Sequence, residues 1–260
     1  MQQVVGGLTS HVDVAQVVLY AFWLFFAGLV FYLRREDKRE GYPLVSETPG
    51  VRLPRSGGWP SPPSPKTFKL HDGKTYTAPP GNTDSRDFPL KATSPTPGSP
   101  FVPVGQALGA GVGPGAYALR LDEPDMTFAG EIKIVPLRVA TDFWIESNDI
   151  DPRGLTVVGA DDKPAGTVTD VWVDRAEPQI RYLEVALSGK GKNVLLPILF
   201  ADIQASRKQV KVDALLAADL AGVPTTKSAD QVTAREEDRI TAYFGGGRFY
   251  SVATRKEPLL

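Results

Sequence analysis

The chain has 260 residues, and its 29 Lys and Arg nearly balance its 30 Asp and Glu. That length allows one membrane span and one well-packed domain. The near-neutral charge lacks the basic excess that a nucleic-acid surface needs, so we expect no nucleic acid partner. The sequence has no Cys, and His11 and His71 are its only imidazoles. These counts exclude disulfides, thiolate metal sites and a His-rich metal cluster, and we expect no metal site.

Residues 14–33 form a run of twenty residues without a charge. At ~1.5 Å per residue, a helix of this length crosses the ~30 Å hydrocarbon core of a bilayer. A secretory signal peptide is the main alternative, but it needs a basic N-terminal region, and no Lys or Arg precedes residue 34. Four basic residues follow the run closely, namely Arg34, Arg35, Lys38 and Arg39. The positive-inside rule therefore predicts one span with residues 1–13 outside and the remainder in the cytoplasm.

Two small residues in this span, Ala21 and Gly28, are seven positions apart and share one helix face. Small residues allow a neighbouring helix to approach closely, so both are interface candidates. Chance is the alternative, because membrane helices are often rich in Gly and Ala. Asp13 precedes the run and suits the positive end of a helix dipole.

Residues 34–130 are predicted to form an extended strap laid over partner subunits. Fifteen of the 23 prolines fall between residues 43 and 114. Proline restricts the backbone and removes a donor, which disfavours a packed domain, although Asp72 and Gly73 offer a turn for a short hairpin. A flexible linker is the alternative. It gives no reason for the aromatic residues in this region, which are Trp59, Phe68, Tyr76, Phe88 and Phe101.

Residues 131–250 show the pattern of a mainly β domain. Short β-branched runs are separated by turn residues, which predicts a small antiparallel barrel. The predicted strands cover residues 155–161, 165–175, 180–187, 192–198 and 208–214. Helices are predicted over 212–222 and from the capping box at Thr233 to Gly245, and residues 251–260 should form a loose tail. The predicted fold class is one N-terminal transmembrane helix plus this cytoplasmic domain with its C-terminal helix.

Carboxylates are the main candidates for chemistry. The glycine-rich segment 105–115 lacks the Lys-Ser/Thr pair of a phosphate-binding loop, which argues against nucleotide binding. Acidic residues gather in two groups, Asp122, Glu123, Asp125 and Glu131, and Asp170, Asp174, Glu177 and Glu184. Such groups usually form a solvated face, but closely spaced carboxylates also raise one another's pKa and can pass protons.

Several segments together resemble the H subunit of the purple-bacterial photosynthetic reaction centre. They are YLRREDKREGYPL (32–44), PKTF (65–68), VGPGAYALR (112–120), KIVPLRVATDF (133–143), VTDVWVDRAEPQIRYLEVAL (168–187) and REEDRITAYFGGGRFYS (235–251). The resemblance covers essentially the whole chain and implies a PRC-type barrel that caps the L and M subunits. It implies no cofactor on this chain, with bacteriochlorophyll, bacteriopheophytin, quinones and non-haem iron in the partner subunits.

The resemblance further implies a non-catalytic subunit of the bacterial inner membrane, with a periplasmic N-terminus, that assists proton transfer to the secondary quinone. Possible neighbours are a cytochrome subunit, the light-harvesting 1 antenna and membrane lipids. The family's proton-path carboxylate falls on Glu177, with Asp174 beside it. Asp170 and Arg181 lie in the same matched block, and Arg181 is an interface candidate.

One departure from the family pattern concerns proton entry. Some members carry a His-x-His pair where this chain has Met-Thr-Phe-Ala-Gly-Glu at 126–131. Proton entry is therefore expected through carboxylates such as Glu131, Asp125 and Glu123. Two other functions stay open: a membrane-anchored PRC-barrel adaptor without a photosynthetic role, and a membrane-tethered hydrolase or transferase. The adaptor should carry a basic face, and the enzyme should show a nucleophile with its base or a metal set.

Overall fold

The computed structural model describes residues 13–42, 58–79, 86, 88–96, 98–189 and 191–255. The chain divides into two compact units, residues 1–85 and residues 86–260, and each is described by itself. The predicted outer segment before Asp13 lies outside the described residues, as do residues 256–260 of the predicted tail.

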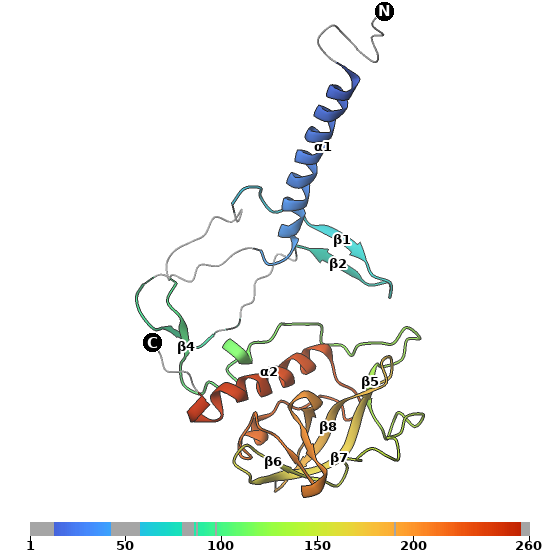
Figure 1. Ribbon diagram of the computed structural model, residues 1–260, viewed down its shortest axis with the longest axis vertical. Coiled ribbons are helices and arrows are strands. Elements are labelled where there is room, and N and C mark those ends of the chain that lie inside the picture. Colours follow the sequence, from blue (N-terminus) through green and yellow to red (C-terminus); the bar gives the residue numbers. More distant parts are fainter. Residues whose placement is uncertain are drawn as a thin grey trace, which may run out of the picture. The chain divides into compact units, whose positions relative to one another are not determined.

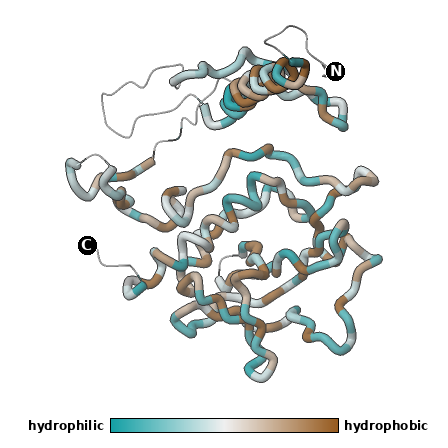
Figure 2. The backbone as a smooth tube through the Cα atoms, turned by 45° about the horizontal axis from the view of Figure 1, so that its top comes forward, coloured by the Kyte–Doolittle hydropathy of each residue, from teal (hydrophilic) through white to brown (hydrophobic). Residues whose placement is uncertain are grey.

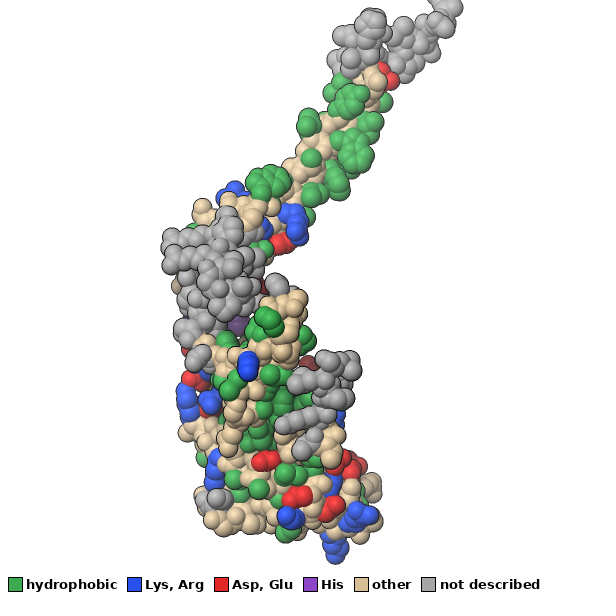
Figure 3. Space-filling view, turned by 90° about the vertical axis from the view of Figure 1, so that its left-hand side faces the viewer, with side chains coloured by type: hydrophobic (Ala, Val, Ile, Leu, Met, Phe, Trp, Pro, Cys, Tyr) green, Lys and Arg blue, Asp and Glu red, His purple; other side chains and the backbone are tan. Residues whose placement is uncertain are grey.

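The N-terminal unit is built on helix α1, Val14–Glu36, which continues into a 3₁₀ turn, Asp37–Arg39. The Asp13 side chain caps α1 by accepting hydrogen bonds from the backbone N–H groups of Ala15 and Gln16. Apolar side chains cover α1, and Lys and Arg gather at its C-terminal end (Figure 3). By length and composition α1 can cross a membrane, which confirms the predicted apolar helix. Its residues 14–33 are all exposed, including the face with Ala21 and Gly28.

The predicted hairpin at Asp72 and Gly73 is confirmed. Strands β1, Lys66–Lys69, and β2, Thr75–Ala78, pair antiparallel. Gly73 takes a positive φ of 82° in the turn, a conformation that glycine adopts without strain. Arg39 holds the base of the hairpin, because its guanidinium donates to the carbonyls of Ser64 and Ala78, each at 2.9 Å.

The C-terminal unit contains one seven-stranded sheet (Figure 1). Six strands are paired in the order β10-β11-β6-β7-β8-β9, and β5 pairs with β7. Their bounds are β5 Ile134–Pro136, β6 Thr156–Val158, β7 Pro164–Asp174, β8 Gln179–Leu187, β9 Asn193–Pro197, β10 Asp202–Gln204 and β11 Gln209–Lys211. Neighbours pair antiparallel except β11 and β6, which run parallel. The mainly β domain is confirmed, and β5 and β10 add two strands that the sequence analysis missed.

Buried and exposed residues do not alternate regularly along β7. Its pairing with β8 shifts register twice, between Val168 and Asp170 and between Trp172 and Val173. Each bulge changes which face the following side chains occupy, so a simple two-residue period is lost.

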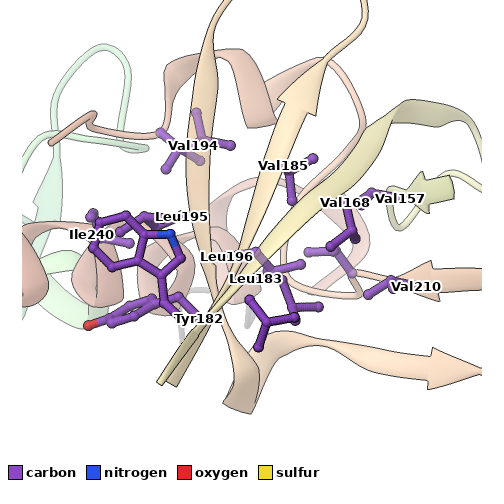
Figure 4. Close-up of a cluster of buried hydrophobic side chains, with 14 of the residues drawn as sticks. Val157, Val168, Tyr182, Leu183, Val185, Val194, Leu195, Leu196, Val210 and Ile240 are labelled. Atoms are coloured by element: carbon purple, nitrogen blue, oxygen red, sulfur yellow. The ribbon is translucent and has the colours of Figure 1, made fainter. Parts of the chain in front are cut away.

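The core of this unit lies along the sheet and under helix α2, Ala234–Tyr250. Tyr182 and Ile240 lie at one end of the drawn cluster, and Val157, Val168 and Val210 lie at the other (Figure 4). Hydrophilic residues gather in the peripheral loops (Figure 2). The capping box predicted at Thr233 is confirmed: its hydroxyl accepts from the N–H of Glu236, whose carboxylate accepts from the N–H of Thr233.

The prediction that α2 ends at Gly245 was wrong, because Gly245, Gly246 and Gly247 lie inside the helix. They let other segments approach closely. A Cβ on Gly247 would stand 2.3 Å from Leu215 Cδ2, and one on Gly246 would stand 3.2 Å from the Cα of Gly115. The close packing offsets the low helix propensity of glycine.

The helix predicted over residues 212–222 was also wrong. Only a 3₁₀ turn, Asp219–Gly222, forms there. The backbone of the segment pairs with the end of β6 instead: Val212 donates to the carbonyl of Val158, and Ala160 donates to that of Leu215. Tertiary packing of buried apolar side chains thus overrides the helical pattern.

Part of the predicted strap lies within the C-terminal unit. Strands β3, Leu90–Ala92, and β4, Phe101–Pro103, form a hairpin. Farther along, the carbonyls of Leu121 and Glu123 accept hydrogen bonds from the backbone of Arg235 and Ala234. These contacts satisfy donors that the first turn of a helix cannot pair internally. Placement of the strap on other subunits stays a prediction.

Candidate functional site

Three groups of charged side chains contain most of the predicted site residues of the C-terminal unit. The first, which we call the corner cluster, consists of Glu131, Lys133, Asp174, Arg175 and Glu177. It lies where β5 pairs with the end of β7. Asp174 is only 1% exposed, and its carboxylate lies 3.4 Å from Lys133 Nζ. Arg175 and Glu131 form an ion pair at 3.0 Å.

Glu177 belongs to the corner cluster through the turn that leaves β7. Its backbone N–H donates to Asp174 Oδ1 at 3.2 Å, and Ala176 donates to the same oxygen at 3.0 Å. The Glu177 carboxylate itself is exposed and accepts from Gln179. The turn therefore binds the backbone of an exposed glutamate to a buried carboxylate.

The second group, the helix cluster, surrounds Glu237 on α2 and consists of Glu237, Tyr182, Arg181, Asp125 and Arg120. Tyr182 on β8 donates its hydroxyl to Glu237 Oε2 at 2.8 Å, and Arg181 lies 3.8 Å from the same oxygen. Burial raises the pKa of Glu237, and the Asp125 charge adds to the rise, whereas Tyr182, Arg181 and Arg120 oppose it. Burial and then the Glu237 charge also raise the pKa of Tyr182. Glu237 is therefore a largely buried carboxyl that keeps its proton at a higher pH than an exposed glutamate does.

The third group, the arginine network, is centred on Arg138 and joins it to Asp170, Glu184, Trp172 and Asp230. The Arg138 guanidinium donates to Asp170 at 2.9 Å, to Glu184 at 2.7 Å and to Asp230 at 3.1 Å. The Trp172 indole N–H donates to Glu184 at 3.0 Å.

Glu184 stays ionised within the arginine network. Its burial alone would raise the pKa of its carboxyl, but hydrogen bonds from Arg138, Trp172 and Asn193 outweigh that effect and lower the pKa. Because each acid here has a fixed cationic partner, the network suits a structural role better than proton exchange.

The structure brings some of the predicted site residues together and separates others. Glu177, Asp174 and Glu131 share the corner cluster, while Asp125 and Arg181 join the helix cluster. The two clusters are linked by the backbone, since Lys133 donates to the carbonyl of Asp125.

Asp170 and Glu123 lie outside the corner cluster, and the two small residues of α1 belong to the other unit of the chain. Asp170 lies four residues before Asp174 on β7, about 13 Å along the strand, in the arginine network. Glu123 is exposed and contributes its carbonyl to the start of α2. Ala21 and Gly28 belong to the N-terminal unit, where a Cβ at Gly28 would meet no described atom within 4 Å.

Sequence patterns did not indicate Glu237 and Tyr182 as candidate site residues, nor Arg138 as the centre of a structural network. Glu237 lies in the first turn of a helix with a capping box, where an acidic residue is common. The available signal was Tyr182, because a tyrosine on a buried strand position needs a partner for its hydroxyl. Within the described residues, no group of three or more His, Asp and Glu side chains is arranged to hold a metal ion.

Comparison with protein families decides the membership of the chain. Residues 6–139, more than half of the chain, match the family of the photosynthetic reaction centre, H-chain N-terminal region. The chain belongs to this family. Residues 146–217 match the PRC-barrel domain, which covers β6 to β11 and the segment that follows. Membership in the H-chain family makes the protein a subunit of a reaction centre complex, and α1 fits a membrane-anchored subunit.

Proposed function

We propose that this H chain caps the L and M subunits on the cytoplasmic side and assists proton transfer to the secondary quinone during light-driven electron transport. In this proposal the pigments, the quinones and the non-haem iron belong to the partner subunits, and the chain catalyses no reaction of its own. The complex would lie in the inner membrane of a purple bacterium. The charge distribution around α1 supports a cytoplasmic C-terminal unit, since Lys and Arg occur only after the apolar run.

The observation that carries the proton-transfer proposal is the pair of linked clusters. The backbone N–H of Glu177, whose side chain is exposed, donates to the buried Asp174 carboxylate, and the buried Glu237 has a raised pKa. A quinone that gains two electrons also takes up two protons, so it needs groups that bind and release protons near the working pH. Exposed carboxylates can collect protons from water, and a carboxyl with a raised pKa can hold them.

The test measures transfer of the second electron to the quinone after two light flashes in the intact reaction centre. Glu177→Gln keeps the shape of the side chain and removes its titration. We expect this variant to slow the second electron transfer about tenfold, which corresponds to about 1.4 kcal/mol in the barrier. Primary charge separation should stay unchanged, because the pigments lie on other subunits.

Two further variants sharpen the test. Glu146→Gln removes an exposed carboxylate outside the three groups and should leave both rates unchanged. Combining Glu177→Gln with Asp174→Asn should give a non-additive loss if the two carboxylates act in one path. The second electron transfer should be measured from about pH 6 to about pH 9. A wild-type rate for Glu177→Gln over this whole range would show that Glu177 is not in the proton path.

A further inference from the structure

Two side chains of α2 and one of β8 form a series of hydrogen-bonding groups. Glu237 and Thr241 are four positions apart on α2, so they share one face of the helix. The Tyr182 hydroxyl, on β8, donates to Glu237 Oε2 at 2.8 Å. Thr241 forms a side-chain hydrogen bond with the same tyrosine. The Tyr182 oxygen therefore lies between a threonine hydroxyl and a carboxylate.

The series runs from the surface to the interior of the C-terminal unit. Thr241 is exposed, whereas Tyr182 is 3% exposed and Glu237 is 8% exposed. Water can therefore reach the threonine hydroxyl directly, while the tyrosine hydroxyl is shielded. A buried carboxyl that exchanges protons with water needs groups that carry the proton across the shielded part.

The two hydrogen bonds of Tyr182 point in the same direction. A hydroxyl has one proton to donate and two lone pairs that accept. Tyr182 uses its proton on Glu237, so its oxygen is the acceptor in the hydrogen bond with Thr241, and the threonine is the donor. Each hydroxyl can therefore give up its own proton on one side and receive another proton on the other side.

The charges around Glu237 suit it as the end of this series. Arg181, on β8, lies 3.8 Å from Glu237 Oε2. Asp125 and Arg120 act on the same carboxyl from the segment before β5. Burial, assisted by the Asp125 charge, raises the pKa of Glu237, so the carboxyl takes up a proton at a higher pH than an exposed glutamate does. Burial also raises the pKa of Tyr182, so the phenol does not stay ionised near neutral pH.

We propose that Thr241 and Tyr182 form a proton relay that carries protons from water to Glu237. The relay rests on the proposed function, because protons held at Glu237 would serve the quinone. It is a route of entry separate from Glu177 and the other exposed carboxylates.

One transfer along the relay moves one proton from water to the carboxylate. A hydronium ion gives a proton to Thr241 Oγ1, the threonine gives its own proton to Tyr182 Oη, and the tyrosine gives its proton to ionised Glu237. At each hydroxyl one O–H bond forms and one breaks, so the products are a water molecule and a protonated Glu237. Rotation of the two hydroxyl groups then restores the starting arrangement.

The test follows the protonation of Glu237 after a rapid drop in pH, in the purified full chain in a neutral detergent. The infrared C=O band of the protonated carboxyl reports the reaction, and loss of the band in Glu237→Gln assigns it. We expect Thr241→Val, which keeps the shape of the side chain, to slow protonation about tenfold. The titration midpoint should stay unchanged, because Tyr182 still donates to the carboxylate. Thr241→Ser keeps a hydroxyl and should protonate at the wild-type rate.

Tyr182→Phe removes the central hydroxyl and should slow protonation about a hundredfold. It should also move the titration midpoint upward, because the ionised carboxylate loses a donor. The matched control is Tyr243→Phe, which removes a phenol hydroxyl that donates to the carbonyl of Asp219 at 2.9 Å. This control should keep the wild-type rate and midpoint. Circular dichroism verifies that each variant still folds.

Two outcomes would overturn the relay. The first is a wild-type protonation rate in Thr241→Val or in Tyr182→Phe, even if the titration midpoint moves, because Tyr182 would then be only a structural partner of Glu237. The second is an equal loss of rate in Tyr182→Phe and Tyr243→Phe.

The proposed function is tested apart from the relay by the second electron transfer of Glu237→Gln in the intact reaction centre. A slower transfer in this variant would place Glu237 on the path to the quinone. If the variant keeps the wild-type rate while Tyr182→Phe slows protonation of Glu237, the relay stands and Glu237 does not serve the quinone.

Discussion

Glu237 shows how one residue's surroundings set its proton affinity. Because burial raises its pKa, the folded state binds a proton at a pH where the unfolded state has lost it. The free energy of unfolding should therefore fall as the pH rises above the ordinary value of 4.5 and through the folded pKa. Glu237→Gln keeps an acceptor for the Tyr182 hydroxyl and removes this titration.

We expect Glu237→Gln to gain stability relative to wild type as the pH rises through this range, and to show no such trend below 4.5. Urea unfolding of the detergent-solubilised chain at several pH values measures the difference. A parallel pH dependence of the two proteins would mean that Glu237 is not shielded from water.

Arg138 has the opposite effect on its neighbours, because its charge keeps a buried acid ionised. It pairs with two buried acids, Asp170 and Glu184. Asp170 and Glu184 are each 7% exposed, and Arg138→Met would leave them without their cation. We expect a loss of about 3 kcal/mol in the free energy of unfolding, at the low end for a broken buried pair because Arg138 is itself partly exposed. Since the folded pKa of Glu184 is lowered, its ionised form contributes stability above the ordinary pKa of 4.5.

The loss in Arg138→Met should accordingly shrink as the solution is acidified below 4.5 and Glu184 protonates. Arg153→Gln is the matched control, since it breaks an exposed pair with Asp151 and should cost about 0–1 kcal/mol. Similar losses in the two variants at neutral pH would contradict the central position of Arg138.

At the scale of elements, the glycine run of α2 is a packing device. Gly247→Ala should improve intrinsic helix propensity, yet its methyl group would collide with Leu215 and with the carbonyl of Ala214. We expect overpacking to dominate and to lower the free energy of unfolding by about 1–3 kcal/mol. Arg248→Ala introduces the same residue at the next, exposed position and should change stability by less than about 0.5 kcal/mol. A stabilised Gly247→Ala variant would show that the contact is loose.

The elements that the sequence predicted well are those fixed by local patterns. The apolar run gave α1, the Asp72 and Gly73 turn gave the β1–β2 hairpin, and the capping box at Thr233 gave the start of α2. The predictions were wrong for elements whose structure depends on contacts with distant parts of the chain. The glycines of α2 resembled a stop signal, because their packing against residues 114–115 and 214–215 cannot be read from the sequence. The buried site residues were hidden for the same reason, since Tyr182 and Glu237 are 55 positions apart.

At the scale of the whole molecule, the chain combines an apolar helix that nothing described covers with a domain that has its own core. An apolar helix that is exposed along residues 14–33 needs either lipid or neighbouring helices, which fits a membrane-anchored subunit of a larger complex.

Isolation of the full chain from its native membranes through a C-terminal affinity tag tests this assembly most directly. We predict that the chain elutes in a stoichiometric complex with subunits that carry bacteriochlorophyll, visible in the absorption spectrum of the eluate. The cofactors should leave with those subunits when the complex is dissociated. Elution of the chain without pigment, or with bound RNA in its place, would contradict a role in the reaction centre.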